Sequence, residues 1–262
     1  MKQSHTPSTP PPKTALITGA AQRLGRAMAL ALAAQGWDIV VHYRSSATQA
    51  QETAAEIRAL GRQCHLIQAD LSEPQAAPAL FARALEHSPS IDLLINNASL
   101  FEYDSADKFD AELLQAHLGP NLVAPLQLTQ CFAQQDDFSA AVRHGVVIHF
   151  LDQKLWHLNP DFFSYTLCKA ALQAAVGMHA QALAPRIRVM GIAPGLTLPS
   201  HLQSPQDFER THQLSPLGQG STPKDITDTV LYIANTSSLT GSTILVDAGQ
   251  HLMGLERDFS LL

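Results

Sequence analysis

Tyr165 and Lys169 are the two side chains of this chain whose types and spacing best fit proton transfer. They lie four residues apart in the segment "FFSYTLCKAALQAAVG", whose pattern predicts a long helix, so both fall on one helical face. An ammonium group beside a phenol stabilises the phenolate, and the phenol then gives and takes a proton more readily near neutral pH. The pair therefore predicts acid–base chemistry.

A glycine-containing turn, "TGAAQRLG" (18–25), lies between a short apolar run and a helix. Gly19 permits the tight turn, and Gly25 allows the helix to pack closely on the strand. The free N–H groups at the start of the helix favour a pyrophosphate. Strand, turn and helix in this order predict a dinucleotide site that includes Gly19, Leu24 and Gly25. Arg23 is unexpected here, because a cation is unfavourable at a helix N-terminus.

The end of the second apolar run, "HYRSS" (42–46), distinguishes between the two nicotinamide dinucleotides. A site specific for NAD usually has an acidic residue here to hold the ribose hydroxyls, and this segment has none. A guanidinium with two neighbouring hydroxyls matches a 2′-phosphate instead. We therefore predict NADP(H), held at this edge by His42, Tyr43, Arg44 and Ser45.

Two further strand ends fit the same cofactor. The segment "QADLS" brings Asp70 and Leu71 to the end of a strand, where a carboxylate or the neighbouring amides can meet the adenine. The segment "NNA" (96–98) ends another strand and places a small residue where the backbone must pass under the ribose. We expect Asn97 and Ala98 to contact the cofactor.

The elements that must position these side chains alternate between short β-rich runs and longer helical segments. The short runs are almost continuously hydrophobic, which is typical of parallel strands covered on both faces. We therefore predict an α/β fold of the Rossmann type, a doubly wound parallel sheet of about seven strands with helices on both faces. The expected strands are 14–19, 38–44, 64–70, 91–97, 145–152, 187–193 and 242–247. The expected helices are 23–35, 47–60, 74–88, 110–134, 163–184 and 224–235.

Length and composition fit one such domain. The chain has 262 residues, 45% of them hydrophobic, and we place the domain at 13–262 after a disordered, proline-rich tail at 1–12. A net charge of −6 without a dense Lys/Arg stripe argues against nucleic acid as a partner. Because the sequence has neither an apolar stretch of membrane-span length nor a signal-peptide pattern, we expect a cytoplasmic protein. Three widely spaced cysteines and twelve histidines without ligand spacing predict neither a disulfide framework nor a metal site.

The combination of motifs resembles the short-chain dehydrogenase/reductase family. It comprises Thr18-Gly19…Gly25, Asn96-Asn97-Ala98, Tyr165-x-x-x-Lys169 and Pro194-Gly195, and it spans nearly the whole chain after the tail. The resemblance implies that Tyr165 is the catalytic acid/base, and that Lys169 binds the nicotinamide ribose and lowers the phenol pKa. It also implies that Asn121 holds a water in the proton relay and that Pro194 and Gly195 contact the cofactor. A homo-oligomer, commonly a tetramer, is expected from the same resemblance.

Three residues depart from the pattern of most of that family. The position thirteen residues before Tyr165, where a serine usually helps to polarise a carbonyl, is Asp152. An ionised aspartate repels a developing alkoxide, but a carboxyl group can supply a proton, directly or through water, to the nitrogen of a C=N bond. The other two departures are Arg23 in the glycine turn and Phe101 just beyond the fourth strand.

These departures resemble the pteridine reductase branch of the family, which includes bacterial dihydromonapterin reductases. The shared segments are "TGAAxRLG", "HYRSS", "QADLS", "NNASxF" and "APGL". The branch implies a pterin sandwiched between the nicotinamide and Phe101, with Ser99 bound to the pterin or to a cofactor phosphate. It also implies that Arg23 bridges the cofactor pyrophosphate and the polar edge of the pterin. Leu196 either lines the pocket or packs.

We therefore expect NADPH-dependent reduction of a dihydropterin, with hydride transfer to a ring carbon and a proton from Asp152 through water or from Tyr165. Two alternatives stay open: a general NADP-dependent carbonyl reductase or alcohol dehydrogenase of the same family, and an NADP(H)-binding sensor without turnover. Structural roles stay open too, since Asp152 could cap a helix or pair with a cation, and Phe101 could belong to the core. Leu155 and Trp156 could face the substrate or pack.

Overall fold

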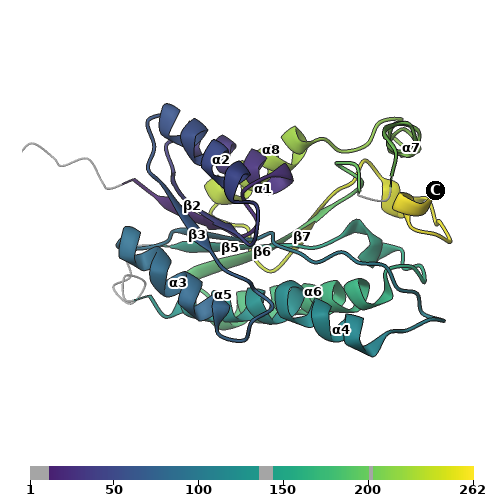
Figure 1. Ribbon diagram of the computed structural model, residues 1–262, viewed down its shortest axis with the longest axis horizontal. Coiled ribbons are helices and arrows are strands. Elements are labelled where there is room, and N and C mark those ends of the chain that lie inside the picture. The colour runs from purple at the N-terminus through teal and green to yellow at the C-terminus, as the bar shows by residue number, and fades with distance from the viewer. Residues whose placement is uncertain (1–11, 136–143, 201–202) are drawn as a thin grey trace, which may run out of the picture.

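The computed structural model describes residues 12–135, 144–200 and 203–262. Within these residues one seven-stranded sheet has the order β3-β2-β1-β4-β5-β6-β7, and all neighbouring strands are parallel (Figure 1). The strands are β1 (Thr14–Ile17), β2 (Asp38–Tyr43), β3 (Cys64–Gln68), β4 (Leu93–Asn96), β5 (Gly145–Phe150), β6 (Ile187–Pro194) and β7 (Thr243–Val246). The predicted doubly wound parallel sheet is confirmed. The predicted tail, 1–12, lies outside the described residues except for Pro12.

Helices cover both faces of the sheet (Figure 1). Those over one face are α1 (Arg23–Ala34), α2 (Ala47–Ala59) and α8 (Pro223–Asn235), and those over the other are α3 (Ala76–His87), α5 (Ala124–Ala133) and α6 (Phe163–Leu183). Because successive side chains of a strand point to opposite faces, each strand contributes to two cores. Ile17 packs toward α1 and α8, whereas Leu16, its neighbour in β1, packs toward α3, α5 and α6.

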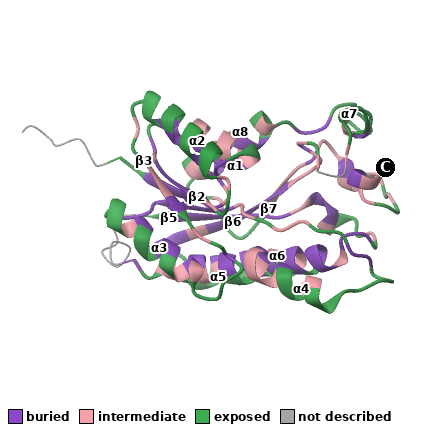
Figure 2. Ribbon diagram, viewed as in Figure 1, coloured by how far each residue is buried: buried purple, intermediate pink, exposed green. Residues whose placement is uncertain are grey.

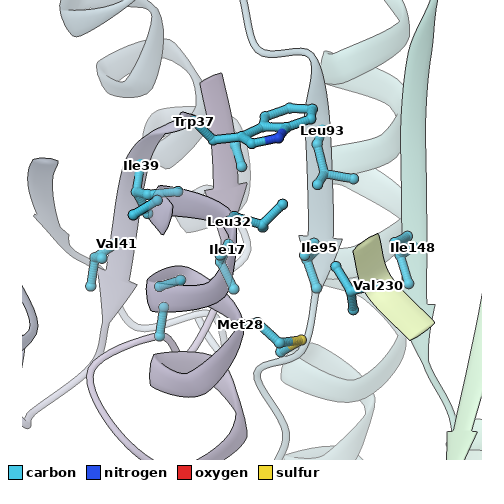
Figure 3. Packing of buried hydrophobic residues seen from close by; sticks show 14 of the residues in the cluster. Ile17, Met28, Leu32, Trp37, Ile39, Val41, Leu93, Ile95, Ile148 and Val230 are labelled. Atoms are coloured by element: carbon cyan, nitrogen blue, oxygen red, sulfur yellow. The ribbon is translucent and has the colours of Figure 1, made fainter. Parts of the chain in front are cut away.

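The core on the α1 side shows why the amphipathic segments fold onto the strands. Met28 and Leu32 lie one turn apart on α1 and point toward Ile17 and Ile95 of the sheet, where Val230 of α8 joins them (Figure 3). All five side chains are buried, and each contributes about 1.5–3 kcal/mol by leaving water. The outward faces of the helices are exposed while the strands are buried (Figure 2), which is the pattern expected for a sheet covered on both sides.

The strand order reverses between β1 and β4. The chain runs outward from β1 to β2 and β3 on one side, and then crosses back to β4 and continues to β7 on the other. In open sheets of this kind, ligands bind in the crevice beyond the carboxyl ends of the strands at the point of reversal. The ends of β1 and β4 therefore mark the place where a functional site is expected.

Several segments differ from the expected elements. Helix 110–134 is divided into α4 (Ala111–Leu118) and α5 by a π turn, Gly119–Val123. Several strands end one or two residues earlier than expected, because the chain turns away at the carboxyl edge. α7 (Pro205–His212), which lies near the C-terminus in Figure 1, is not predicted because its residues are mostly polar; the hydroxyl of Ser204 caps it.

In the described part of the chain, no helix combines the length and apolarity needed to cross a membrane.

Candidate active site

A cleft of about 720 Å³ opens at the carboxyl ends of the strands and contains nearly all of the residues singled out from the sequence. Those that line it are Gly19, Arg23, Leu24, Gly25, His42, Tyr43, Arg44, Ser45, Asp70, Leu71, Asn97, Ala98, Ser99, Phe101, Asp152, Tyr165, Pro194, Gly195 and Leu196. Asn121 and Lys169 are buried behind the lining. The structure thus brings the predicted cofactor and substrate residues together around one space.

The turn after β1 is tied to the end of β4 by side-chain hydrogen bonds. Oγ1 of Thr18 accepts from the N–H groups of Asn97 and Ala98, each at 2.9 Å. Nδ2 of Asn97 donates back to the Thr18 carbonyl at 2.8 Å. Gly19 has a φ of +64°, which glycine adopts without strain. These contacts fix the two strand ends between which a dinucleotide is expected.

Gly25 leaves no room for a side chain. A Cβ at this position would lie 2.1 Å from the carbonyl oxygen of Gly19 and 2.8 Å from Cα of Ala20. The first turn of α1 is therefore pressed directly against the turn after β1, and its residues line the cleft. The first N–H groups of a helix have no partner within the helix, so this surface fits a pyrophosphate.

His42 supports the same turn from the end of β2. Its Nδ1 accepts from the N–H of Gly19 at 3.1 Å, which leaves Nε2 to donate to the carbonyl of Ala69 at 3.2 Å. Burial lowers the pKa of His42 to about 4, although the Ala69 carbonyl and Asp70 act in the opposite direction. The ring is therefore neutral near pH 7, and it links the ends of β1, β2 and β3 rather than offering a charge to the cleft.

At the outer end of the cleft, beside the ends of β2 and β3, Arg44 supplies a positively charged side chain and Asp70 a negatively charged one. Arg44 and Ser45 are exposed on the lining where β2 ends. Oδ1 of Asp70 accepts from the N–H and the hydroxyl of Ser72 at 3.0 and 2.7 Å, and these bonds, together with the nearby Arg44, lower the pKa of Asp70. A carboxylate held by Ser72 and an exposed guanidinium suit an adenine edge and a phosphate respectively.

Arg23 has a φ of +54°, a conformation that residues other than glycine rarely adopt. Its Nη2 donates to the carbonyl of Pro199 at 2.8 Å, so the side chain reaches from the first turn of α1 to the segment that follows β6. Backbone strain of this kind costs about 1–3 kcal/mol and is found most often at functional sites. The arginine therefore connects the turn after β1 with the segment that carries Leu196.

Asp152 and Tyr165 meet at the inner end of the cleft. Oη of Tyr165 donates to Oδ2 of Asp152 at 3.0 Å, and the N–H of Lys154 donates to Oδ1 at 2.8 Å. The aspartate therefore caps the short helix Gln153–Trp156 and also faces the phenol of Tyr165, so the capping role is present and the proton-donating role stays a prediction. Burial, followed by the negative charge of Asp258, raises the pKa of Asp152. It keeps a proton to higher pH than an exposed aspartate does.

Lys169 is buried behind Tyr165. Its Nζ donates to the carbonyl of Phe150 at 2.7 Å and lies 5.6 Å from the centroid of the Tyr165 ring. Burial lowers the pKa of Lys169 to about 8. The expected lowering of the phenol pKa is not found. Burial, and after it the negative charge of Asp152 and the hydrogen bond to it, raise the pKa of Tyr165 well above its usual value.

Asn121 lies in the π turn Gly119–Val123. Its side-chain amide forms hydrogen bonds with the loop after β4. Its Oδ1 accepts from the hydroxyl of Ser99 at 3.0 Å and from the N–H of Leu100 at 2.8 Å. Its Nδ2 donates to the Leu100 carbonyl at 2.9 Å. The side chain thus fixes the loop that carries Ser99 and Phe101, and its water-holding role stays a prediction.

Phe101 belongs both to the cleft wall and to a packed aromatic group. Its ring stacks on Phe162, with centroids 4.0 Å apart and planes 16° apart, and meets Tyr165 edge-on at 4.8 Å. Phe162 is fully buried and has a φ of +50°, which is strained for an aromatic residue. The ring of Phe101 is therefore held in a fixed orientation beside the phenol.

Three residues whose roles the sequence leaves open are placed by the structure. Leu196 lines the cleft, and its N–H donates to Oε1 of the buried Gln250 at 2.8 Å. Leu155 packs against the hydrophobic cluster on the α6 side of the sheet, and Trp156 is exposed. Neither Leu155 nor Trp156 lines the cleft, so packing is the role that the structure supports for Leu155.

The C-terminal segment adds residues to the cleft that the sequence analysis does not identify. Asp258, Phe259 and Ser260 line it beside Asp152 and Tyr165. They follow no strand and belong to no motif, and they lie far along the chain from the other residues, so no local signal marks them. In the described residues, no group of three His, Cys, Asp or Glu side chains is placed to hold a metal ion.

Comparison with known proteins agrees with this geometry. The short chain dehydrogenase family profile matches residues 13–210. The crystal structure of FolM alternative dihydrofolate reductase 1 from Brucella canis, complexed with NADP, is 39% identical, covers 92% of this chain and 94% of that chain, and has a TM-score of 0.86. 3beta-hydroxysteroid dehydrogenase 1 of Eggerthella lenta is 31% identical over 92% of this chain and 94% of the relative. Pteridine reductase 1 of Leishmania tarentolae is 30% identical over 94% of this chain and 98% of the relative.

The resemblance inferred from the motifs is thereby confirmed, both for the family and for the likeness to pteridine reductases. The family profile covers the strands from β1 to β6 and the helix of Tyr165 and Lys169, and the matching relatives extend over nearly the whole chain. This chain belongs to the short-chain dehydrogenase family.

Proposed function

We propose that this chain is an NADPH-dependent reductase of dihydropterins. The observation that carries the proposal is the hydrogen bond of 3.0 Å between Tyr165 and Asp152, inside a cleft with the fixed ring of Phe101 beside it. A flat heterocycle can stack on such a ring, and a carboxyl group in place of the usual serine can protonate a ring nitrogen. The likeness to the NADP-bound FolM reductase and to pteridine reductase 1 supports the same substrate class.

The residues at the outer end of the cleft fit an NADP(H) cofactor. The close approach of Gly25 to Gly19 leaves the helix start open to a pyrophosphate, and Arg44 with Ser45 offers a charged and a polar donor for a 2′-phosphate. Asp70 would accept from the adenine side. When bound, NADPH supplies the hydride. The cofactor prediction agrees with the NADP in the Brucella canis structure.

Asp152 is proposed to supply the proton. Its raised pKa increases the fraction of carboxylic acid at mildly acidic and neutral pH, and a carboxylic acid can donate to a ring nitrogen directly or through one water. Tyr165 is hydrogen-bonded to the same carboxyl group, and its own raised pKa keeps it protonated, so it can serve as the donor for a different ring bond. Ser99, Leu196 and the Phe101 ring would hold the substrate against this pair.

A general carbonyl reductase is the second candidate. The Tyr165 and Lys169 pair is present, and the 3beta-hydroxysteroid dehydrogenase of Eggerthella lenta shows that the chain is similar to an enzyme whose name indicates alcohol and ketone chemistry. Asp152 stands in place of the serine that usually polarises the carbonyl in this family, and its ionised form would disfavour the alkoxide that forms from a ketone. A sensor that binds NADP(H) without turnover has no need of the buried Tyr165 and Asp152 pair.

Oxidation of NADPH by purified protein, followed by its absorbance, tests these candidates. Dihydromonapterin, dihydrobiopterin and dihydrofolate are each supplied, with a 3-ketosteroid and a simple ketone as controls. Turnover with a dihydropterin and none with the ketones is the expected result. Turnover with a ketone alone would replace the proposal with the second candidate. NADPH binding without oxidation by any of these compounds would favour the sensor.

A further inference from the structure

The C-terminal segment Arg257–Ser260 is fastened to the loop that precedes α6. Oδ2 of Asp161 accepts from Nε of Arg257 at 2.8 Å and from the N–H of Asp258 at 2.9 Å. Asp161 itself is 2% exposed. Burial alone would raise its pKa, but the bonds from Arg257 and Asp258 lower it below its usual value, so the anchor is an ionised carboxylate. We call this segment the C-terminal clasp.

A buried cation, Lys154, holds the clasp from the inside. Its side chain is 2% exposed, and Nζ lies 3.2 Å from Oδ2 of Asp258, bonded also to the carbonyl of Asp161. The same Nζ lies 5.5 Å from the centroid of Phe162, the ring on which Phe101 stacks. The backbone N–H of Lys154 donates to Asp152. One residue therefore connects the carboxyl groups of Asp152 and Asp258.

Both carboxyl oxygens of Asp258 have polar partners. Its Oδ1 accepts from the N–H and the hydroxyl of Ser260 at 2.9 and 2.6 Å, and its Oδ2 faces the ammonium of Lys154. Each of these donors stabilises the negative form. Asp152 has fewer donors and lies on the same cleft wall. When two carboxyl groups share a site, the one with fewer donors takes the proton.

Resting on the proposed function, we propose that Asp258 is a positioning residue whose negative charge, held at the cleft by the C-terminal clasp, keeps Asp152 in its proton-donating form. The charged and titratable groups around Asp152 are Lys154 on the short helix after β5, Tyr165 and Lys169 on α6, and Asp258 on the clasp. Of these, Asp258 favours the neutral carboxyl, whereas Lys154 and the hydrogen bond from Tyr165 favour the carboxylate.

The sign of the effect follows from this arrangement. Removal of the Asp258 charge removes a repulsion that acts only on the ionised form of Asp152, so the pKa of Asp152 must fall. Activity that depends on the carboxylic acid is then lost at a lower pH than in the wild-type protein. At neutral pH we expect kcat to fall by up to about tenfold, since the fraction of acid falls tenfold for each unit that the pKa drops below the pH.

The test compares Asp258→Asn with Arg257→Gln in the full-length chain. Asparagine keeps the size of residue 258 and can still accept from Ser260. Arg257→Gln removes the ion pair between Arg257 and Asp161. It keeps the bond from the Asp258 N–H to Asp161 and the contact of Asp258 with Lys154, so the charge of residue 258 stays at the cleft. The pKa of Asp152 is measured without substrate or cofactor, by carboxyl ¹³C NMR of protein labelled at aspartate, with Asp152→Asn to assign the signal. The pH profile of kcat is then recorded with a dihydropterin.

The expected result is a lower pKa of Asp152 in Asp258→Asn, an unchanged one in Arg257→Gln, and recovery in Asp258→Glu. An unchanged pKa in Asp258→Asn would overturn the proposal, and so would an equal decrease in Arg257→Gln, because packing of the clasp would then be the cause. The NMR titration separates this proposal from the proposed function. If the wild-type protein reduces no dihydropterin, the function fails while the effect of Asp258 on Asp152 is still measured.

Discussion

The two ends of the cleft are built in different ways. At the outer end, where we propose that the cofactor binds (the cofactor end), hydrogen bonds between backbone groups and the side chains of Thr18, Asn97 and His42 join the ends of β1, β2 and β4, and each of these residues lies within a short motif. At the inner end, where we propose that the substrate binds (the substrate end), the loop after β5 and the C-terminal clasp are joined by side-chain contacts between residues distant in the chain, such as Lys154 and Asp258. The first end depends on hydrogen bonds to backbone groups between residues of recognisable motifs, and the second on ion pairs between side chains that belong to no motif.

This difference indicates at which end of the cleft ligand specificity can change without loss of the fold. The cofactor end is an extension of the sheet, so a change there disturbs the strand ends themselves. The substrate end is a set of segments held against α6 by a few polar anchors, of which Lys154 and Asp161 are buried. A buried charge that loses its partner is strongly destabilising. Removal of one partner of these ion pairs should therefore detach the segment from α6. The four predictions below test whether the two ends can be damaged separately.

The largest effect is expected for Asp152→Asn, at the substrate end. The amide cannot give up a proton at neutral pH, so kcat for dihydropterin reduction should fall by about 10²–10⁴-fold. The Kd of NADPH, measured by nicotinamide fluorescence, should not change, because residue 152 lies at the opposite end of the cleft from Arg44. Asp152→Ser restores the residue usual in the family and should also lose dihydropterin reduction. Retained turnover in either variant would remove Asp152 from the mechanism.

Gly25→Ala should damage the cofactor end alone. The added Cβ would overlap the Gly19 carbonyl oxygen, 2.1 Å away, so the turn after β1 must shift. Such overpacking costs about 1–3 kcal/mol, and we expect NADPH affinity to fall by about 10- to 100-fold. Gly177→Ala on α6 is the matched control, since a Cβ there meets no atom within 4 Å. Equal losses of affinity in the two variants would contradict this explanation.

Arg44→Ala should change which dinucleotide is bound. A charge-assisted hydrogen bond contributes about 1.5–3 kcal/mol, so the Kd of NADPH should rise by about tenfold or more. The Kd of NADH should not change, because NADH has no 2′-phosphate to lose a partner. The ratio of the two constants is the measurement. A parallel rise in both would show that Arg44 supports the turn and does not select the cofactor.

Arg23→Gly should have the smallest effect and should act on both ends. Glycine relieves the strain of a φ of +54°, so the free energy of unfolding should change little or rise by up to about 1 kcal/mol. The bond to Pro199 is lost, and kcat/KM should fall several-fold. Arg23→Lys keeps the charge and the strain, and separates the two effects. A variant that is both less stable and fully active would contradict the bridging role.

The same division explains what the sequence can predict. The sheet follows from hydrophobic runs, and the cofactor end from contiguous segments such as 18–25, because local residues there determine local geometry. Asp152 is found from its spacing to Tyr165. The spacing of Tyr165 and Lys169 predicts a neighbouring ammonium, but it does not report the depth of burial, which raises the pKa of Tyr165. Burial is a property of the assembled fold.

The C-terminal clasp is beyond sequence analysis for a similar reason. Asp258 and Lys154 become partners only after the whole sheet is assembled, and neither has a pattern around it that differs from an exposed loop. α7 is missed because the segment is short and mostly polar, so it has few apolar residues from which a helix could be predicted. The roles of individual site residues, the oligomeric state and the tail at 1–12 stay predictions.

A π turn contains one residue more than the α-helical turn that it replaces. At Gly119–Val123 this extra residue offsets the faces of α4 and α5 by about 100° around the helix axis, the rotation of one residue. Deletion of one residue there would convert the segment into an uninterrupted α-helix and turn Asn121 away from Leu100. The extra residue thus lets α5 follow the core while Asn121, within the π turn, presents its amide to a loop beside the cleft.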